Sequence, residues 1–280
     1  MILVDRGPEH PDLPAIRTAE LARIEVIRSA GRFPRSDEFG ARLRAVRSLL
    51  RARQHFVCCY CEKFSEEKYA TVEHVRPKAE TRRSNGRLER GYWWLAWSWE
   101  NLLFCCEQCN GHKDTWFPLR GDDQPPHVGR PLAERDVPPG HEHPLLLDPA
   151  ADDGIAAIQF RLVRGRWIPQ PREGSRRGYE TIQRIQLDRS DLLDLYTSVA
   201  RDLDESVARI RSAMSTTTPP SSVVSAIWHE VLRRQLRPGA PLCGLRYDIF
   251  DHHFPRRVRQ RWDISLDEHA SRLTARRTGA

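Results

Sequence analysis

Six of the seven cysteines stand in two short clusters, CCYCE at 58–62 and CCEQC at 105–109. Each cluster contains a pair of cysteines that encloses two residues, and four thiolates so spaced can converge tetrahedrally on one Zn²⁺. The predicted ligands are Cys58, Cys61, Cys106 and Cys109. Zinc held by four sulfurs has no open position, so this ion would be structural rather than catalytic. Buried cysteines without a metal are the alternative, and Cys59, Cys105 and Cys243 are expected to pack in that way as small apolar groups.

The segment VEHVRPK at 72–78, between the two clusters, carries an adjacent carboxylate and imidazole. In a β-prone stretch the side chains of Glu73 and His74 point to opposite faces. Glu73 could hold a hard divalent cation such as Mg²⁺ or Mn²⁺, and His74, with an ordinary pKa of about 6.5, could take a proton from water. An isolated Glu-His pair is more typical of a surface salt bridge, so the assignment depends on the residues around it. Arg76 and Lys78 could hold phosphates, or could equally be a solvated basic strand end.

The second cysteine cluster runs directly into Asn110 and Lys113, in ENLLFCCEQCNGHK at 100–113. If a short helix begins at this cluster, the two residues lie one turn apart on the same face. Asn110 would then offer an amide oxygen to a metal, and Lys113 would offer an ammonium to a phosphate.

Apolar spacing, β-propensity and chain breakers predict the elements that must position these residues. They are two helices at 15–31 and 37–55 with Pro34 between them, a strand at 69–75, a polar loop at 84–90 and the aromatic segment GYWWLAWSWEN at 91–101. The tryptophans of this segment could be base-stacking platforms, but are expected to pack in the core.

The later part of the chain is predicted to be mostly helical. It should comprise a connector at 120–144, a hairpin that turns at Arg164 and Gly165, one long amphipathic helix or two over 179–214, a helix at 223–236 and a frayed tail beyond 266. The predicted domains are an N-terminal helical segment at 1–55, a cysteine-containing core at 56–119, a connector with a small β hairpin at 120–178 and a C-terminal helical region at 179–280.

The composition is that of a globular, basic protein. The 280 residues are 39% hydrophobic, and Lys and Arg outnumber Asp and Glu by 45 to 38, which gives a net charge of +7. An arginine-rich surface suits phosphate, although a balance of this size is also common in proteins that never contact nucleic acid. No run of about 18 apolar residues and no leader peptide is evident, so we expect a cytoplasmic protein that does not enter a membrane.

The order C-x-x-C, EH-x-x-P, N-L and C-x-x-C-N-x-x-K resembles the HNH endonucleases. The resemblance implies an α+β fold with a ββα-metal (HNH, His-Me finger) core and a four-cysteine zinc knuckle, flanked by N-terminal helices and a C-terminal helical region. It implies that Glu73 and Asn110 ligate the catalytic metal, that His74 is the general base and that Asn101 pins the loop that orients His74. Many HNH enzymes carry histidine where this chain has Asn110, which leaves His112 open as a ligand.

CCYCE, EHVRPK, WWLAWSWENLL and CNGHKDTWFP are similar to the HNH nucleases of the Septu antiphage systems and of some retrons. LLLDPAADD and GYETIQRIQLDRSDL extend the resemblance over roughly residues 45–200. It implies an endonuclease that cleaves DNA as the effector of a bacterial defence complex, with an ATPase subunit or a retron as partner. A free-standing restriction-type or homing-type HNH enzyme is one alternative, and a non-catalytic zinc-knuckle module that binds nucleic acid is another.

Overall fold

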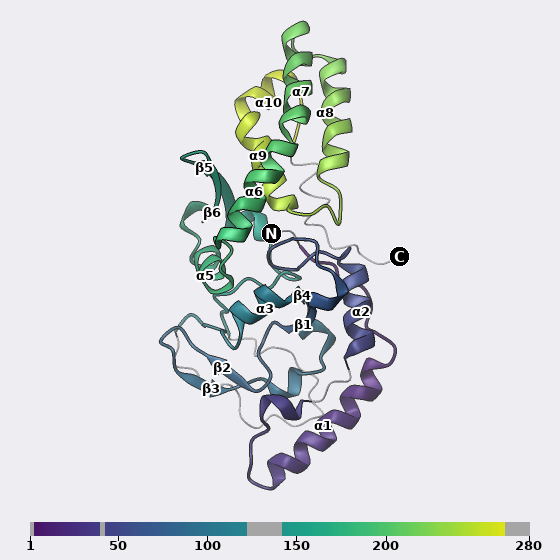
Figure 1. Ribbon diagram of the computed structural model, residues 1–280, viewed down its shortest axis with the longest axis vertical. Helices are drawn as coiled ribbons and strands as arrows, with labels where there is room; N and C mark the ends of the chain where they lie inside the picture. Colours follow the sequence, from purple (N-terminus) through teal and green to yellow (C-terminus); the bar gives the residue numbers. More distant parts are fainter. Residues whose placement is uncertain (1–2, 40–42, 122–141, 267–280) are drawn as a thin grey trace. The chain divides into compact units, whose positions relative to one another are not determined.

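The computed structural model describes residues 3–39, 43–121 and 142–266 (Figure 1). This part of the chain combines helices with three two-stranded antiparallel sheets, β1 with β4, β2 with β3 and β5 with β6, which confirms the predicted α+β class. Most of the predicted connector and the predicted frayed tail lie outside the described residues. No helix in the described ranges has the length and apolar character needed to cross a membrane.

Contacts divide the chain into two compact units. The first, called here the strand unit, comprises Arg6–Phe56 and Ser65–Asp148, and the second, the helical unit, comprises Met1–Asp5, Val57–Phe64 and Pro149–Ala280. The strand unit contains α1 (Leu13–Ser29), η1 (Ser36–Glu38), α2 (Arg44–Arg53), η2 (Glu67–Tyr69), β1 (Ala70–His74), β2 (Glu80–Arg82), β3 (Leu88–Arg90), η3 (Trp93–Leu95), η4 (Trp99–Asn101), β4 (Leu102–Cys106) and α3 (Glu107–Lys113).

The pairing of β1 with β4 organises the strand unit. The register sets Glu73 opposite Leu103 and His74 opposite Leu102. Every residue of β4 is buried, as expected of a strand that is covered on both faces. The side-chain amide of Gln54, just beyond α2, both accepts from the Phe104 N–H and donates to the Phe104 carbonyl, each over 2.8 Å. Gln54 therefore pairs with β4 as a neighbouring strand would.

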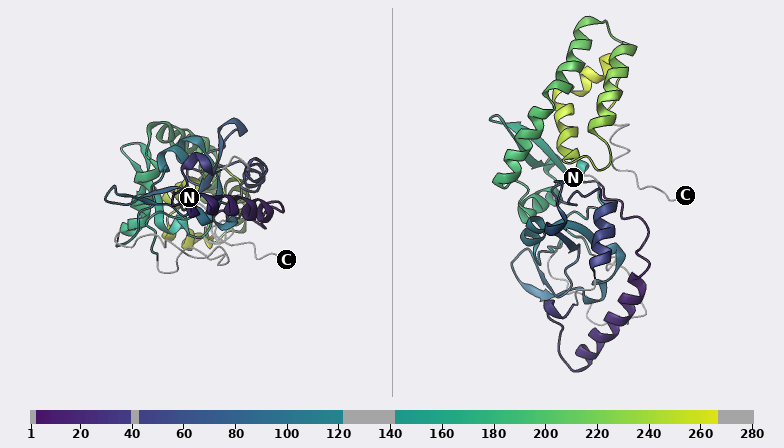
Figure 2. Two further views of the ribbon diagram at one scale, coloured as in Figure 1. Left: turned by 90° about the horizontal axis from the view of Figure 1, so that it is seen from below. Right: turned by 45° about the vertical axis from the view of Figure 1, so that its right-hand side comes forward.

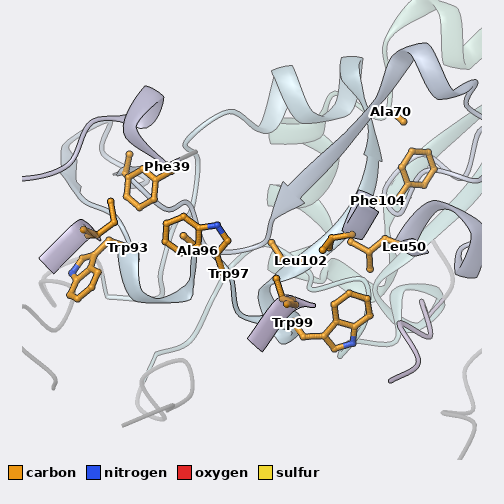
Figure 3. Close-up of a cluster of buried hydrophobic side chains, with 13 residues drawn as sticks. Phe39, Leu50, Ala70, Trp93, Ala96, Trp97, Trp99, Leu102 and Phe104 are labelled. Atoms are coloured by element: carbon orange, nitrogen blue, oxygen red, sulfur yellow. The ribbon is translucent and has the colours of Figure 1, made fainter. Parts of the chain in front are cut away.

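A hydrophobic core fills the space between these strands, α1 and α2 (Figure 3). Leu13 and Ile24 come from α1, and Val46 and Leu50 from α2, at the helical spacing seen in the sequence. Trp93, Trp97 and Trp99 are buried in the same cluster. This burial confirms the prediction that these tryptophans pack in the core. Burying such large rings contributes a major share of the energy that stabilises the core.

From Pro149 onward, the helical unit contains α4 (Gly154–Ala157) and then the β5–β6 hairpin. β5 (Ile158–Val163) and β6 (Arg166–Pro171) turn at Arg164 and Gly165, as predicted. The rest of this unit is η5 (Arg172–Gly174), α5 (Arg176–Ile185), α6 (Ser190–Asp202), α7 (Asp204–Thr216), α8 (Ser222–Gln235), α9 (Cys243–His253) and α10 (Arg256–Trp262). Helices α7 and α8 lie side by side (Figures 1 and 2) and are joined by two hydrogen bonds, of 3.2 and 2.7 Å, from Arg209 to Glu230.

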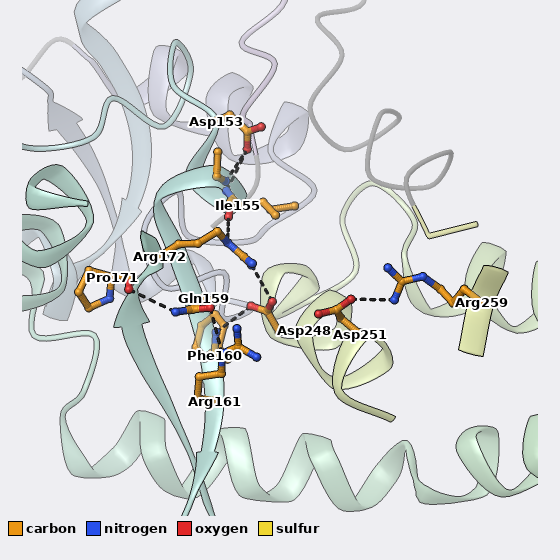
Figure 4. A network of polar contacts seen from close by, with 11 residues as sticks. Asp153, Ile155, Gln159, Phe160, Arg161, Pro171, Arg172, Asp248, Asp251 and Arg259 are labelled. Carbon is orange, nitrogen blue, oxygen red and sulfur yellow. Dashed lines mark hydrogen bonds and ion pairs between the residues drawn. The ribbon is translucent and has the colours of Figure 1, made fainter. Parts of the chain in front are cut away.

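A buried carboxylate joins the hairpin to α9 in the helical unit (Figure 4). Asp248 accepts from the Phe160 N–H over 2.7 Å and from the Arg172 guanidinium over 2.8 Å. Arg172 also donates to the Ile155 carbonyl over 2.8 Å. Burial raises the pKa of Asp248, and the bonds from Phe160 and Arg172 oppose that shift. This network is structural, because the buried carboxylate is satisfied by its neighbours.

Two expectations about elements are corrected. The amphipathic stretch at 179–214 is neither one helix nor two, because α5, α6 and α7 divide it. Gln186 adopts the left-handed conformation that ends α5, and Leu203 separates α6 from α7. The predicted polar loop at 84–90 includes β3, which pairs with β2 as a hairpin.

We predict that Gly178→Ala lowers the free energy of unfolding by about 2 kcal/mol, because a Cβ there would lie 2.1 Å from the Ala157 carbonyl oxygen. Gly111→Ala is the matched control, since Gly111 is also helical and a Cβ there meets nothing within 4 Å. That control should be neutral or stabilising by up to about 1 kcal/mol. Urea denaturation of both variants measures the difference, and equal effects would contradict this packing.

Candidate metal and catalytic site

The four predicted cysteine ligands converge. The sulfur atoms of Cys58, Cys61, Cys106 and Cys109 all lie within 4.8 Å of one another, and all four residues are buried. Zn–S bonds of about 2.3 Å would set tetrahedral sulfurs roughly 3.8 Å apart. The buried cysteine cluster can therefore hold a metal ion such as zinc with little adjustment. None of the seven cysteines, all of which are described, forms a disulfide.

Local backbone structure presents each pair. Cys58 donates its N–H to the Lys63 carbonyl and accepts from the Glu62 N–H, both over 3.0 Å, so the first pair lies on a tight turn. Cys106 ends β4 and is the N-cap residue of α3, and Cys109 lies in the first turn of that helix. Strand end and helix start thus bring the second pair to one place.

The remaining cysteines behave as small buried groups. Cys59 and Cys105 are buried, as is Cys243, and burial raises the pKa of the Cys243 thiol. The sulfurs of Cys58, Cys59 and Cys105 also come within 4.8 Å of one another, which leaves a competing ligand set. The spacing of two enclosed residues favours the four-cysteine set.

A second cluster surrounds a pocket of about 610 Å³ in the strand unit. Glu73, His74 and Lys78 line it from β1 and the following loop, and Asn110 and Lys113 line it from α3. Residues 33–36 also line it, and sequence reasoning missed them because this segment is distant from the motifs in the chain. The short helix predicted at the second cysteine pair is confirmed as α3.

His74 is held by one ring nitrogen. Its Nε2 lies 2.9 Å from the Ala96 carbonyl oxygen. Because a carbonyl can only accept, we assign the proton to Nε2, which leaves the lone pair of the neutral ring on Nδ1. Burial, together with the nearby charge of Lys78, lowers the pKa of His74 to about 3. The imidazole is therefore neutral near pH 7, with Nδ1 unprotonated.

Glu73 and Lys113 form a buried ion pair. The distance from Lys113 Nζ to Glu73 Oε1 is 2.7 Å, and the side chains of Lys113 and Glu73 are 1% and 2% exposed. The same ammonium donates to the His74 carbonyl over 2.8 Å. Lys113 thus contacts the predicted metal ligand and the backbone of the predicted base, whereas its expected contact with phosphate stays a prediction.

Asn101 closes the loop that follows His74. Its side-chain oxygen accepts from the Arg76 N–H over 2.7 Å, and its side-chain nitrogen donates to the Arg76 and Leu95 carbonyls, each over 3.0 Å. The backbone carbonyl of Asn101 also accepts from the Val75 N–H. These contacts fix Val75 and Arg76, the two residues that follow His74. They also fix Leu95, which precedes Ala96, the residue whose carbonyl holds the His74 ring.

The predicted phosphate ligands differ in their surroundings. Arg76 is nearly buried, with its Nε 3.2 Å from Glu142 and its guanidinium over the Phe117 ring. Its charge is therefore compensated within the protein. Lys78 lines the pocket and is half-buried, and burial lowers its pKa. Glu142 could not be found from the sequence, because it lies 66 positions from Arg76 with no motif around it.

A glycine supports the loop at 77–79 from behind. The Gly91 N–H donates to the Ala79 carbonyl and the Tyr92 N–H donates to the Pro77 carbonyl, both over 2.8 Å. A Cβ on Gly91 would lie 2.6 Å from the Pro77 carbonyl oxygen, so only glycine fits here. The wall of the pocket that carries Lys78 is therefore packed backbone against backbone.

Asn110 and His112 differ in position although both lie on α3. Asn110 is half-buried and lines the pocket. Among the described residues that line the pocket, His112 does not appear. It lies two positions after Asn110, and side chains at that spacing on a helix point to different faces. The geometry favours Asn110 as the ligand, and the assignment of all these site residues remains a prediction.

Comparison with known proteins finds a Septu protein. The chain is 32% identical over 179 residues to the Septu protein PtuB of Bacillus mycoides (strain KBAB4), and the match covers 61% of this chain. It covers 56% of the relative, so the chain spans little more than half of that protein's length. The predicted resemblance to a Septu protein is thereby confirmed. No family model and no solved structure matches the chain.

We predict that Cys109→Ser abolishes bound zinc and lowers the yield of folded protein, because a four-sulfur site loses a ligand and with it folding energy. Zinc per chain, measured by mass spectrometry of the purified protein, tests this. Cys59→Ala is the control, since it belongs only to the competing set. Retention of zinc by Cys109→Ser together with its loss in Cys59→Ala would contradict the assignment.

Proposed function

We propose that this protein is an HNH endonuclease that hydrolyses phosphodiester bonds of DNA with Mg²⁺ or Mn²⁺. The observation that supports this most strongly is that His74, held through Nε2, lines one pocket together with Glu73 and Asn110. Two antiparallel strands, β1 and β4, followed directly by α3 are also the arrangement expected of a ββα-metal core. A binding module would not need this combination of residues.

The residues of the pocket divide the work. Glu73 and Asn110 offer oxygen donors, which suit a hard divalent ion that keeps several waters. When bound, such an ion would supply charge stabilisation at the scissile phosphate and the leaving oxygen. His74 would accept the proton of the attacking water at Nδ1. Asn101 acts as a positioning residue by fixing the backbone after His74, and Lys78 would hold a flanking phosphate.

We also propose that the nuclease serves antiphage defence within a complex. The likeness to the Septu protein PtuB supports this role. The partner would be an ATPase subunit (PtuA-like) or a retron, and the helical unit, which has no predicted residue of the catalytic pocket, offers surface for it. Copurification of an ATPase with the tagged chain from its native host would support this context.

We expect purified protein with Mn²⁺ to nick or linearise supercoiled plasmid, and His74→Ala to reduce the rate by about 100-fold or more, because the proton acceptor is lost. Gel assays with time courses measure the rate. His10→Ala, a histidine outside the pocket, should cut as the wild type does. Unchanged cutting by His74→Ala, with zinc content and melting temperature also unchanged, would remove the proposed mechanism.

A second pair of variants tests the choice of metal ligand. Asn110→Ala should raise the Mn²⁺ concentration that gives half-maximal cutting by more than about 10-fold. A loss of roughly 10-fold is typical when a residue that only supports a metal ligand is removed, and loss of a ligand should cost more. His112→Ala should change this Mn²⁺ concentration by no more than about 2-fold, which is well below the roughly 10-fold effect expected at a residue that supports the metal. The reverse result would assign the role to His112 instead.

A further inference from the structure

The buried pair of Glu73 and Lys113 is not explained by phosphate binding. The ammonium lies 2.7 Å from Glu73 Oε1 and 2.8 Å from the His74 carbonyl oxygen, with 1% of its side chain exposed. A flexible lysine meant only for a substrate phosphate would be expected to reach into the pocket as a solvated point charge. Here its charge is placed on the carboxylate that the proposed function assigns to the metal.

Two cations at one carboxylate compete electrostatically. A divalent ion that approaches Glu73 gains the attraction of the carboxylate but is also repelled by Lys113, and this repulsion is strong in a poorly solvated place. Without the ion, the same ammonium offsets the cost of keeping a carboxylate away from water. Lys113 should therefore stabilise the metal-free protein and weaken metal binding at once.

We propose that Lys113 is a built-in counter-cation of the metal site, which keeps Glu73 in place before the metal arrives and lowers the affinity of the site for divalent ions. This inference rests on the proposed function, because it takes Glu73 to be a metal ligand. Lys113 is then a positioning residue, since it acts through Glu73 and the His74 backbone. It also makes the metal-free nuclease core a stable state that binds its metal weakly.

The experiment compares Lys113→Met with Lys78→Met in zinc-loaded protein, in buffers freed of other metals by resin so that the cysteine site is not stripped. Lys78→Met is matched, because it removes the same charge from the same pocket, and the Lys78 ammonium lies over the Phe39 ring rather than on the carboxylate. Mn²⁺ affinity is measured by electron paramagnetic resonance of free Mn²⁺, and stability by the melting temperature with and without Mn²⁺.

We expect Lys113→Met to bind Mn²⁺ about 10-fold more tightly than wild type, while Lys78→Met changes affinity by less than about 3-fold, as charges lacking direct contact are better screened. Without Mn²⁺, the melting temperature of Lys113→Met should fall by about 5 °C or more, because the buried ion pair between Glu73 and Lys113 is broken. Saturating Mn²⁺ should recover most of this loss. Wild-type or weaker Mn²⁺ affinity in Lys113→Met would overturn the inference.

Further variants guard against simple misfolding. Lys113→Gln removes the charge but keeps a donor for the His74 carbonyl, and it should also bind Mn²⁺ more tightly. The double variant Glu73→Gln/Lys113→Met removes both charges of the pair, so it should melt above Lys113→Met without metal. If the double variant melts no higher, the counter-charge role is wrong.

Glu73→Gln separates this inference from the proposed function. Wild-type Mn²⁺ affinity in Glu73→Gln would show that Glu73 is not a metal ligand, and the proposed metal site would fail. Loss of Mn²⁺ binding in Glu73→Gln, with wild-type affinity in both Lys113 variants, would overturn only the role of Lys113.

Discussion

A carboxylate withdrawn from water needs a cation or hydrogen-bond donors close by, and Glu73 on β1 imposes this constraint on the strand unit. Lys113 meets it from a distant part of the chain. It can do so because β4 pairs with β1 and leads without a loop into α3, whose last residue is Lys113. Pairing of the strands, the direct passage into the helix and the ion pair therefore depend on one another.

The backbone of the loop after β1 is held by groups from another part of the chain. Asn101 binds it on one side, and the N–H groups of Gly91 and Tyr92 bind it on the other. The Ala96 carbonyl then fixes the ring of His74. All of these groups come from the stretch between β3 and β4, so the tryptophans buried in that stretch anchor the proposed catalytic loop through the core.

Local signals in the sequence predicted much of this arrangement. The spacing of apolar residues identified α2, although this helix begins at Arg44 rather than at 37 as predicted. The turn at Arg164 identified the β5–β6 hairpin, and the cysteine spacing anticipated the cluster. The β2–β3 hairpin was missed because strands of three residues are too short to show alternation. The pocket wall at 33–36 and the partner of Arg76 were missed because both are long-range contacts that leave no local pattern.

Helix α3 has only seven residues, and it carries Cys109 in its first turn and both Asn110 and Lys113 after it. A helix of this length extends only about 10 Å, so all three side chains project from one short hydrogen-bonded segment. The cysteine cluster and the pocket therefore share a helix, and a shift of its backbone at Cys109 would also move the amide of Asn110 and the ammonium of Lys113.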